Sequence, residues 1–189
     1  AMSSNGDLGL VDGTGLASNY SLNSTVINIT QRVLNSSGSK TYDANTDALA
    51  ADITLSNLVS GETLNHSGTA TLSSANAGSY TISNLTGISL ADNAGLASNY
   101  TLTGGTHNFT VNQKAISLSG TRLYDATTDA VASDLTTISG RVGTETLTLS
   151  GTGSVADANV GVKTVSVGTL ALGDGTGLAA NYTLSGGTH

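Results

Sequence analysis

The side chains in this sequence that could catalyse a reaction are few, and none of them is a cysteine. Nucleophilic catalysis by a hydroxyl needs a neighbouring base, and a third group that orients this base. The candidate bases are the three histidines, His66, His107 and His189. An internal repeat puts His107 and His189 at one equivalent position, whereas His66 aligns with Leu149. A Ser-His-acid site would lack a counterpart in one repeat, so we expect no enzyme and no catalytic residues.

A second candidate chemistry is calcium binding by an oxygen-rich run. Asp43, Asn45 and Asp47 have the alternating spacing with which a calcium-binding loop begins. The glycine and the distal glutamate of such a loop are missing, because Ala48 and Thr54 stand at those places. We expect the acids to bind turn amides or to cap a short helix instead. Calcium remains the alternative, and otherwise we expect no metal and no cofactor.

The composition excludes several other classes of function. The chain has 189 residues, with six Lys and Arg against thirteen Asp and Glu and a net charge of −7. A nucleic-acid partner requires a basic surface that this chain lacks, and an anionic membrane would repel it. Without cysteine the chain forms no disulfide and no thiolate zinc site. It has no run of about 18 apolar residues, so we expect no membrane insertion.

The chain consists of tandem repeats with a period of about 80 residues, the size of a small domain. The string at residues 15–20 returns at 95–100 and, with one Ser changed to Ala, at 177–182. Charged and aromatic residues recur at the same offset. The repeat-defining residues are Tyr20, Tyr100 and Tyr182, Tyr42 and Tyr124, Asp43 and Asp125, and Lys40 and Arg122. With almost no other aromatic residues, each repeat is expected to use these tyrosine rings to fill its core or to seal a junction.

The phase of the repeat predicts three segments. Residues 1–27 match the C-terminal end of a preceding repeat, 28–109 form a first full repeat, and 110–189 form a second. His189 aligns with His107, which precedes an alternating run at 108–111. The second repeat therefore lacks that strand, or the strand belongs to the next domain. Ala1-Met2 resembles a cloning remnant, so we expect a fragment of a longer chain.

Short alternating apolar and polar runs, separated by Gly and Asn, predict strands and tight turns. Strands of about six residues with such turns favour an antiparallel sandwich or roll. Residues 46–52 and 128–134 are richer in Ala and predict one short helix per repeat. The fold class is thus all-β, as tandem small β-domains. An immunoglobulin-like sandwich is favoured, and a β-grasp-like layout with one short helix is the alternative.

Four landmarks carry a family likeness: Lys40-Thr41-Tyr42-Asp43-Ala44, Arg122-Leu123-Tyr124-Asp125-Ala126, Asn76-Ala77-Gly78 and Asn99-Tyr100-Thr101-Leu102. In this order and spacing the chain resembles the YDG-type and related MBG repeats of large bacterial surface proteins, especially hemagglutinin-like adhesins exported by two-partner secretion. Ala44 and Ala126 depart from the expected glycine, and Ala77 from the expected Val. The resemblance implies an extracellular, mainly β repeat in the stalk of an adhesin, without catalytic residues.

The leading hypothesis is therefore a structural spacer that carries a distal adhesive domain away from the bacterial cell for attachment or biofilm formation. We expect a monomer whose partners are the neighbouring repeats of the same chain. The alternative is a repeat that itself binds a glycan, an exopolysaccharide or a host surface protein, for which His66 and Tyr80 are the best candidates. Asn-x-Ser/Thr triplets are possible glycosylation sites, headed by Asn19, Asn23, Asn28, Asn35, Asn65, Asn84, Asn99, Asn108 and Asn181.

Overall fold

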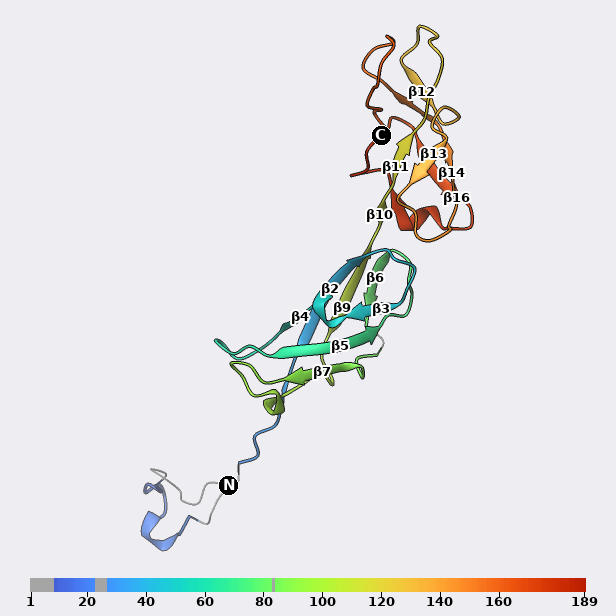
Figure 1. Ribbon diagram of the computed structural model, residues 1–189. Coiled ribbons are helices and arrows are strands. Elements are labelled where there is room, and N and C mark those ends of the chain that lie inside the picture. Colours follow the sequence, from blue (N-terminus) through green and yellow to red (C-terminus); the bar gives the residue numbers. More distant parts are fainter. Residues whose placement is uncertain (1–8, 23–26, 83) are drawn as a thin grey trace.

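The computed structural model describes residues 9–22, 27–82 and 84–189, which form two β repeats placed end to end (Figure 1). The first repeat contains β1 (Arg32–Val33), β2 (Asn35–Thr41), β3 (Asp47–Leu49), β4 (Ile53–Ser56), β5 (Asn65–Thr71), β6 (Gly78–Thr81), β7 (Ile88–Ala91), β8 (Tyr100–Thr101) and β9 (His107–Asn112). The second contains β10 (Lys114–Ala115), β11 (Ser117–Ser119), β12 (Asp129–Val131), β13 (Thr137–Ser139), β14 (Leu147–Ser150), β15 (Thr152–Ser154), β16 (Ala171–Asp174) and β17 (Tyr182–Thr183). The 3₁₀ turns are η1 (Ala17–Asn19), η2 (Ala50–Asp52), η3 (Ala97–Asn99) and η4 (Ala179–Asn181).

The first repeat is a two-sheet sandwich. One sheet has the order β4-β2-β9-β6 and the other the order β3-β5-β7. Alternation along β9 buries Phe109 and Val111 and leaves Asn108 and Asn112 exposed, because successive side chains point to opposite faces of a sheet. These two residues share one core with Ala48 and Ala70, which lie opposite each other on β3 and β5. The predicted all-β class is confirmed.

The central pairing of the larger sheet differs from the antiparallel arrangement that the alternation suggested. β2 and β9 are parallel neighbours in the centre of their sheet, while β4 and β6 flank them in antiparallel orientation. A parallel pair requires a crossover connection, and here the whole intervening part of the repeat serves as that connection. Local alternation identifies the buried face of a strand but not the direction of its partner.

The short helix predicted for residues 46–52 is a strand followed by one 3₁₀ turn. Asp47–Leu49 form β3, with only Ala48 buried, and Ala50–Asp52 form η2. The equivalent residues of the second repeat form β12 and a turn. Tertiary pairing overrides the helix preference of alanine because the small Ala48 side chain fits directly against Ala70 of β5. In the described residues no α-helix packs on a sheet, so the β-grasp alternative is not the observed layout.

The two repeats follow one another without a linker. β9 ends at Asn112 and β10 begins at Lys114, so Gln113 is the only residue between them. β10 pairs in parallel with β17, as β1 pairs with β8 in the first repeat. Residues 110–112, which the repeat phase assigned to the second repeat, hydrogen-bond with β2 of the first. Within the described ranges, no helix is long and apolar enough to cross a membrane.

Candidate functional site: the junction between the repeats

The residues that follow β2 form a loop closed around an ammonium group. Lys40 is nearly buried, and its Nζ donates hydrogen bonds to Asn45 Oδ1 at 2.7 Å and to the carbonyl oxygens of Asn45 and Asp47 at 2.8 Å. The same Nζ lies 2.9 Å from Asp43 Oδ1. Two of the side-chain oxygens that suggested a calcium loop, Asp43 Oδ1 and Asn45 Oδ1, therefore bind the chain's own cation, together with two carbonyl oxygens of the same loop.

The second repeat builds the same loop with an arginine. Arg122 Nη1 lies 2.7 Å from both carboxylate oxygens of Asp125, and its Nη2 donates to the carbonyl of Thr127. Partial burial alone would raise the pKa of Asp43, but hydrogen bonds from Lys40 and from the Asn45 amide outweigh it and hold this pKa below its usual value. Hydrogen bonds from the Thr127 amide and hydroxyl, with the Arg122 charge, lower the pKa of Asp125.

Each loop turns at an alanine with an unusual backbone conformation. Ala44 has φ of 64° and Ala126 has φ of 61°. This left-handed region costs a residue with a Cβ about 1–2 kcal/mol, whereas glycine enters it freely. These are the two positions at which the resemblance predicts glycine. The glycine of a Tyr-Asp-Gly landmark is therefore explained by the positive φ that this turn requires.

Tyr42 and Tyr182 meet where the two repeats join. Both rings are buried, with centroids 5.4 Å apart and an interplanar angle of 80°. Their hydroxyls donate to the two oxygens of one carboxylate, from Tyr42 to Glu145 Oε1 at 2.8 Å and from Tyr182 to Oε2 at 2.6 Å. Tyr42 belongs to the first repeat, and its partners belong to the second. Glu145 thus ties the repeats together.

An asparagine provides the second polar contact across the junction. Asn181 has only 1% of its surface exposed. Its Oδ1 accepts a hydrogen bond from the Ala77 amide at 2.8 Å, and its Nδ2 donates to Asn76 Oδ1 at 3.0 Å. The Asn-Ala-Gly landmark of the first repeat therefore binds the Asn-Tyr-Thr-Leu landmark of the second. A buried Asn181 side chain leaves no room for a glycan at that triplet in the folded junction.

The tyrosines ionise less readily in this setting. Burial and the hydrogen bond to Glu145 raise the pKa of Tyr182 to about 12, and the same causes raise the pKa of Tyr42. In the first repeat the hydrogen bond from Tyr100 to Glu62 raises the pKa of Tyr100. Tyr100 and Glu62 occupy the same repeat positions as Tyr182 and Glu145. Each repeat therefore carries a preformed tyrosine-carboxylate pair.

The remaining predicted site residues are not at the junction. Tyr20 and Tyr124 expose 69% and 66% of their surface, in contrast to their buried repeat equivalents. Glu62 and Glu145 were not among the predicted site residues, although the recurrence of Glu62 at Glu145 was a usable signal. Asn181 was predicted only as a glycosylation triplet, not as a contact between repeats. In a chain with so few charged residues, an acid that recurs at the same position of both repeats indicates a specific contact.

The histidines have structural partners. His107 Nε2 donates to the Leu102 carbonyl at 2.8 Å, and its Nδ1 accepts from the Ser36 hydroxyl at 2.9 Å. His66 Nε2 bonds the carbonyl oxygens of Ala50 and Ile53. The pair considered for ligand binding is divided between the sheets, with His66 on β5 and Tyr80 on β6. Tyr80 donates to the carbonyl of Asn76.

Comparison with protein families matches the YDG domain twice, over residues 26–107 and 106–189. The chain belongs to the YDG domain family. The two YDG matches meet at the first residue of β9, although β9 pairs with β2 and completes the first folded repeat. The second YDG unit therefore begins with a strand that completes the sandwich of the first. Comparisons with curated proteins and with solved structures found no match.

Proposed function

We propose that these YDG repeats are spacers in the stalk of a large bacterial surface adhesin, outside the cell, where they hold a distal adhesive domain away from the surface for attachment or biofilm formation. A stiff stalk needs neighbouring modules whose relative orientation is fixed by contacts between them. The junction contact from Tyr42 through Glu145 to Tyr182 supports this role, because repeat-defining residues form it.

The connection between repeats also favours a stiff rod. A single residue separates β9 from β10, and buried side chains on both sides restrict rotation. Modules that contact only their neighbours add length in proportion to their number. A weakly charged, acidic surface limits non-specific association along such a rod.

Small-angle X-ray scattering of the 189-residue chain tests the rod. We expect a distance distribution with an elongated tail that matches two repeats end to end, unchanged between low and high salt. A compact particle, with one repeat folded against the other, would contradict the proposal. The solution is measured at several dilutions, so that association of chains is separated from the shape of one chain.

A glycan array tests the competing function. A spacer is expected to bind no sugar above background, and an adhesin head domain serves as the positive control. Reproducible, dose-dependent binding of one glycan class by this chain would replace the spacer with a binding module. Substitution of His66 and Tyr80 would then map the contact.

A further inference from the structure

The N-terminal end of the first repeat carries the same polar contact groups as the N-terminal end of the second, where the junction forms. The Tyr100 hydroxyl donates to Glu62 Oε2, and the Tyr182 hydroxyl donates to Glu145 Oε2. Each hydroxyl also accepts from the backbone amide three residues before its glutamate, at 3.1 and 3.0 Å respectively. The first repeat therefore has the arrangement that receives Tyr42 in the second.

The two glutamates differ in what reaches their other carboxylate oxygen. Glu145 Oε1 accepts from Tyr42 of the neighbouring repeat at 2.8 Å. In the part of the chain that the structure describes, no hydrogen bond reaches Glu62 Oε1, although the Glu62 side chain is half-buried like that of Glu145. Polar groups that leave water are normally hydrogen-bonded. An open acceptor at the position where its equivalent binds a tyrosine therefore indicates a contact surface.

The loop beside Tyr100 is already folded for this contact. In the loops at 92–100, 174–182 and 12–20, an alanine amide donates to the aspartate five residues earlier at 2.6–2.7 Å. Residues 12–20 adopt this loop outside any strand, so the local sequence is enough to specify it. In the second repeat this loop places the buried Asn181 against the first repeat, whereas Asn99 of the first repeat is exposed. A partner would therefore meet a preformed loop, without the cost of ordering it.

The chain enters both repeats in the same way. Gln31 Nε2 donates to the Ser98 carbonyl at 3.1 Å, and Gln113 Nε2 donates to the Ala180 carbonyl at 3.0 Å. The strand that follows each glutamine pairs in parallel within its own repeat, β1 with β8 and β10 with β17. These bonds hold the entering segment in one direction. A repeat joined through residues 27–31 would therefore meet the first repeat in the orientation observed at the junction.

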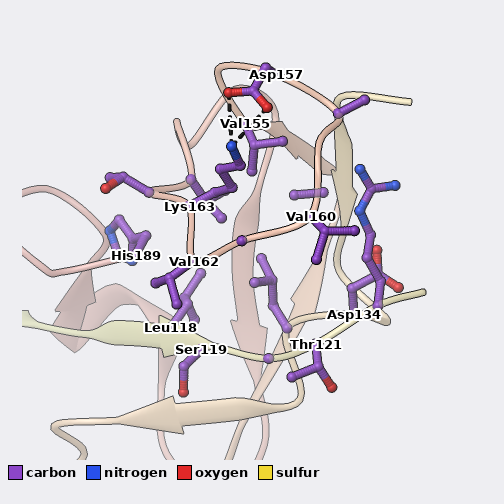
Figure 2. Close-up of a pocket in the computed structure, with 18 of the residues that line it drawn as sticks. Leu118, Ser119, Thr121, Asp134, Val155, Asp157, Val160, Val162, Lys163 and His189 are labelled. Carbon is purple, nitrogen blue, oxygen red and sulfur yellow. Dashed lines mark hydrogen bonds and ion pairs between the residues drawn. The ribbon is translucent and has the colours of Figure 1, made fainter. Parts of the chain in front are cut away.

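The opposite end of each repeat presents a turn that its own side chains hold in place. In the first repeat the Ala77 amide of this turn binds the second repeat, and Tyr80 donates to the Asn76 carbonyl at 2.8 Å. In the second repeat Lys163 replaces Tyr80, and Figure 2 shows it paired with Asp157 at the start of the equivalent turn. Its Nζ lies 2.7 and 2.8 Å from the two carboxylate oxygens. Different side chains thus hold the same Asn-x-Gly turn, so the turn itself is the shared feature.

We propose that Glu62, Asn99 and Tyr100 form a docking surface for the Tyr-Asp end of another YDG repeat, joined to this one through residues 27–31 of the same polypeptide. The tyrosine hydroxyl of that repeat donates to Glu62 Oε1. The central amide of its Asn-x-Gly turn donates to Asn99 Oδ1, as the first repeat binds the second at the observed junction. The inference concerns the contact alone and does not depend on an adhesin role.

The small size of the contact favours a partner in the same polypeptide. At the observed junction it consists of one tyrosine and one turn, which is little for stable association between separate chains. A repeat attached to the segment that Gln31 holds would dock intramolecularly, at a high effective concentration. Because the docking surface and the Tyr-Asp end lie at opposite ends of a repeat, such contacts can add repeats in series.

A three-repeat chain, with residues 108–189 placed ahead of residues 26–189, tests the docking surface. The added repeat presents Tyr124 to Glu62 of the middle repeat, and the middle repeat keeps a unique sequence at residues 96–101. Hydrogen exchange of this segment is measured by mass spectrometry. It should be about fivefold or more slower in the three-repeat chain than in the 189-residue chain, because docking adds hydrogen bonds that local opening must break. Equal exchange rates in the two chains would overturn the inference.

One substitution made at two places separates docking from a general change in stability. Tyr124→Phe in the added repeat removes the hydroxyl that reaches Glu62 and should make residues 96–101 exchange faster again. Tyr124→Phe in the last repeat is the matched control and should leave this segment unchanged, since Tyr124 is 66% exposed there. Equal effects of the two variants would contradict the contact. Sedimentation velocity of the 189-residue chain should show a monomer, and association that Glu62→Gln abolishes would overturn the same-polypeptide assignment. Circular dichroism verifies that each variant is folded.

Discussion

Tyr42 of the first YDG repeat and Tyr182 of the second stand edge to face across the junction, and both hydroxyls donate to the carboxylate of Glu145. Neither tyrosine is adjacent to its partner in sequence, and each belongs to a landmark that recurs in the chain. The repeat-defining residues of one copy therefore act on the next copy. The few charged and aromatic residues of this chain therefore recur at the same repeat positions because they form the contacts between adjacent repeats.

Replacing Tyr42 with Phe should lower the free energy of unfolding by about 1 kcal/mol, because it removes one hydrogen bond to the Glu145 side chain and keeps the ring contact with Tyr182. The measurement is denaturant unfolding monitored by circular dichroism. Tyr124→Phe is the matched control, since the same repeat position is exposed there and should change stability by less than about 0.5 kcal/mol. Equal effects of the two substitutions would contradict the assigned role of Glu145.

Alkaline pH should weaken the junction. The pKa of Tyr182 is raised from its ordinary value of 10.0 to about 12 in the folded chain. A group whose folded pKa is raised contributes stability that is complete below its unfolded pKa and is lost as pH rises through the folded value. The free energy of unfolding should therefore fall between about pH 10 and pH 12. Unfolding curves across this range check it, and Tyr182→Phe should show a shallower decline.

Replacing Ala44 with Gly should stabilise the first repeat by about 1 kcal/mol, because glycine adopts a φ of 64° without a Cβ penalty. Thermal unfolding measures the gain, and Ala126→Gly should give a similar gain in the second repeat. Ala50→Gly is the contrasting variant, since Ala50 is buried in η2 and has no positive φ. It should lose stability. A loss at Ala44 would show that the loop is not strained there.

Calcium should not change the thermal midpoint of the chain, in excess or after chelation. The oxygens of Asp43, Asn45 and Asp47 that could bind the ion surround Lys40 Nζ at 2.7–2.9 Å. An ion that binds the folded state would raise the midpoint with its concentration, so differential scanning calorimetry decides the point. A rise with calcium, reversed by chelator, would restore the metal interpretation of this loop.

Asn181→Ala should loosen the junction while both repeats remain folded. The substitution removes two hydrogen bonds to the first repeat and leaves the half-buried Ala77 amide without the Asn181 oxygen as its acceptor. Small-angle scattering should show a broader distribution of inter-repeat distances than in the wild type. Asn99→Ala alters the same position of the first repeat, where the side chain is exposed, and should leave the profile unchanged.

Much of the molecule could be predicted from the sequence by itself. The recurrence of Tyr42 at Tyr124 and of Lys40 at Arg122 determined the period, and alternation in runs such as 107–112 determined the all-β class, because a half-buried strand must alternate. Only the tertiary structure decided the parallel pairing of β2 with β9, which places the end of the first folded repeat inside the second YDG unit. It also decided that Tyr42 meets Glu145 of the neighbouring repeat and that Lys40 occupies its own loop. The physical reason is that alternation and spacing specify which face of a strand is buried. Which strand covers that face depends on contacts between residues far apart in the chain.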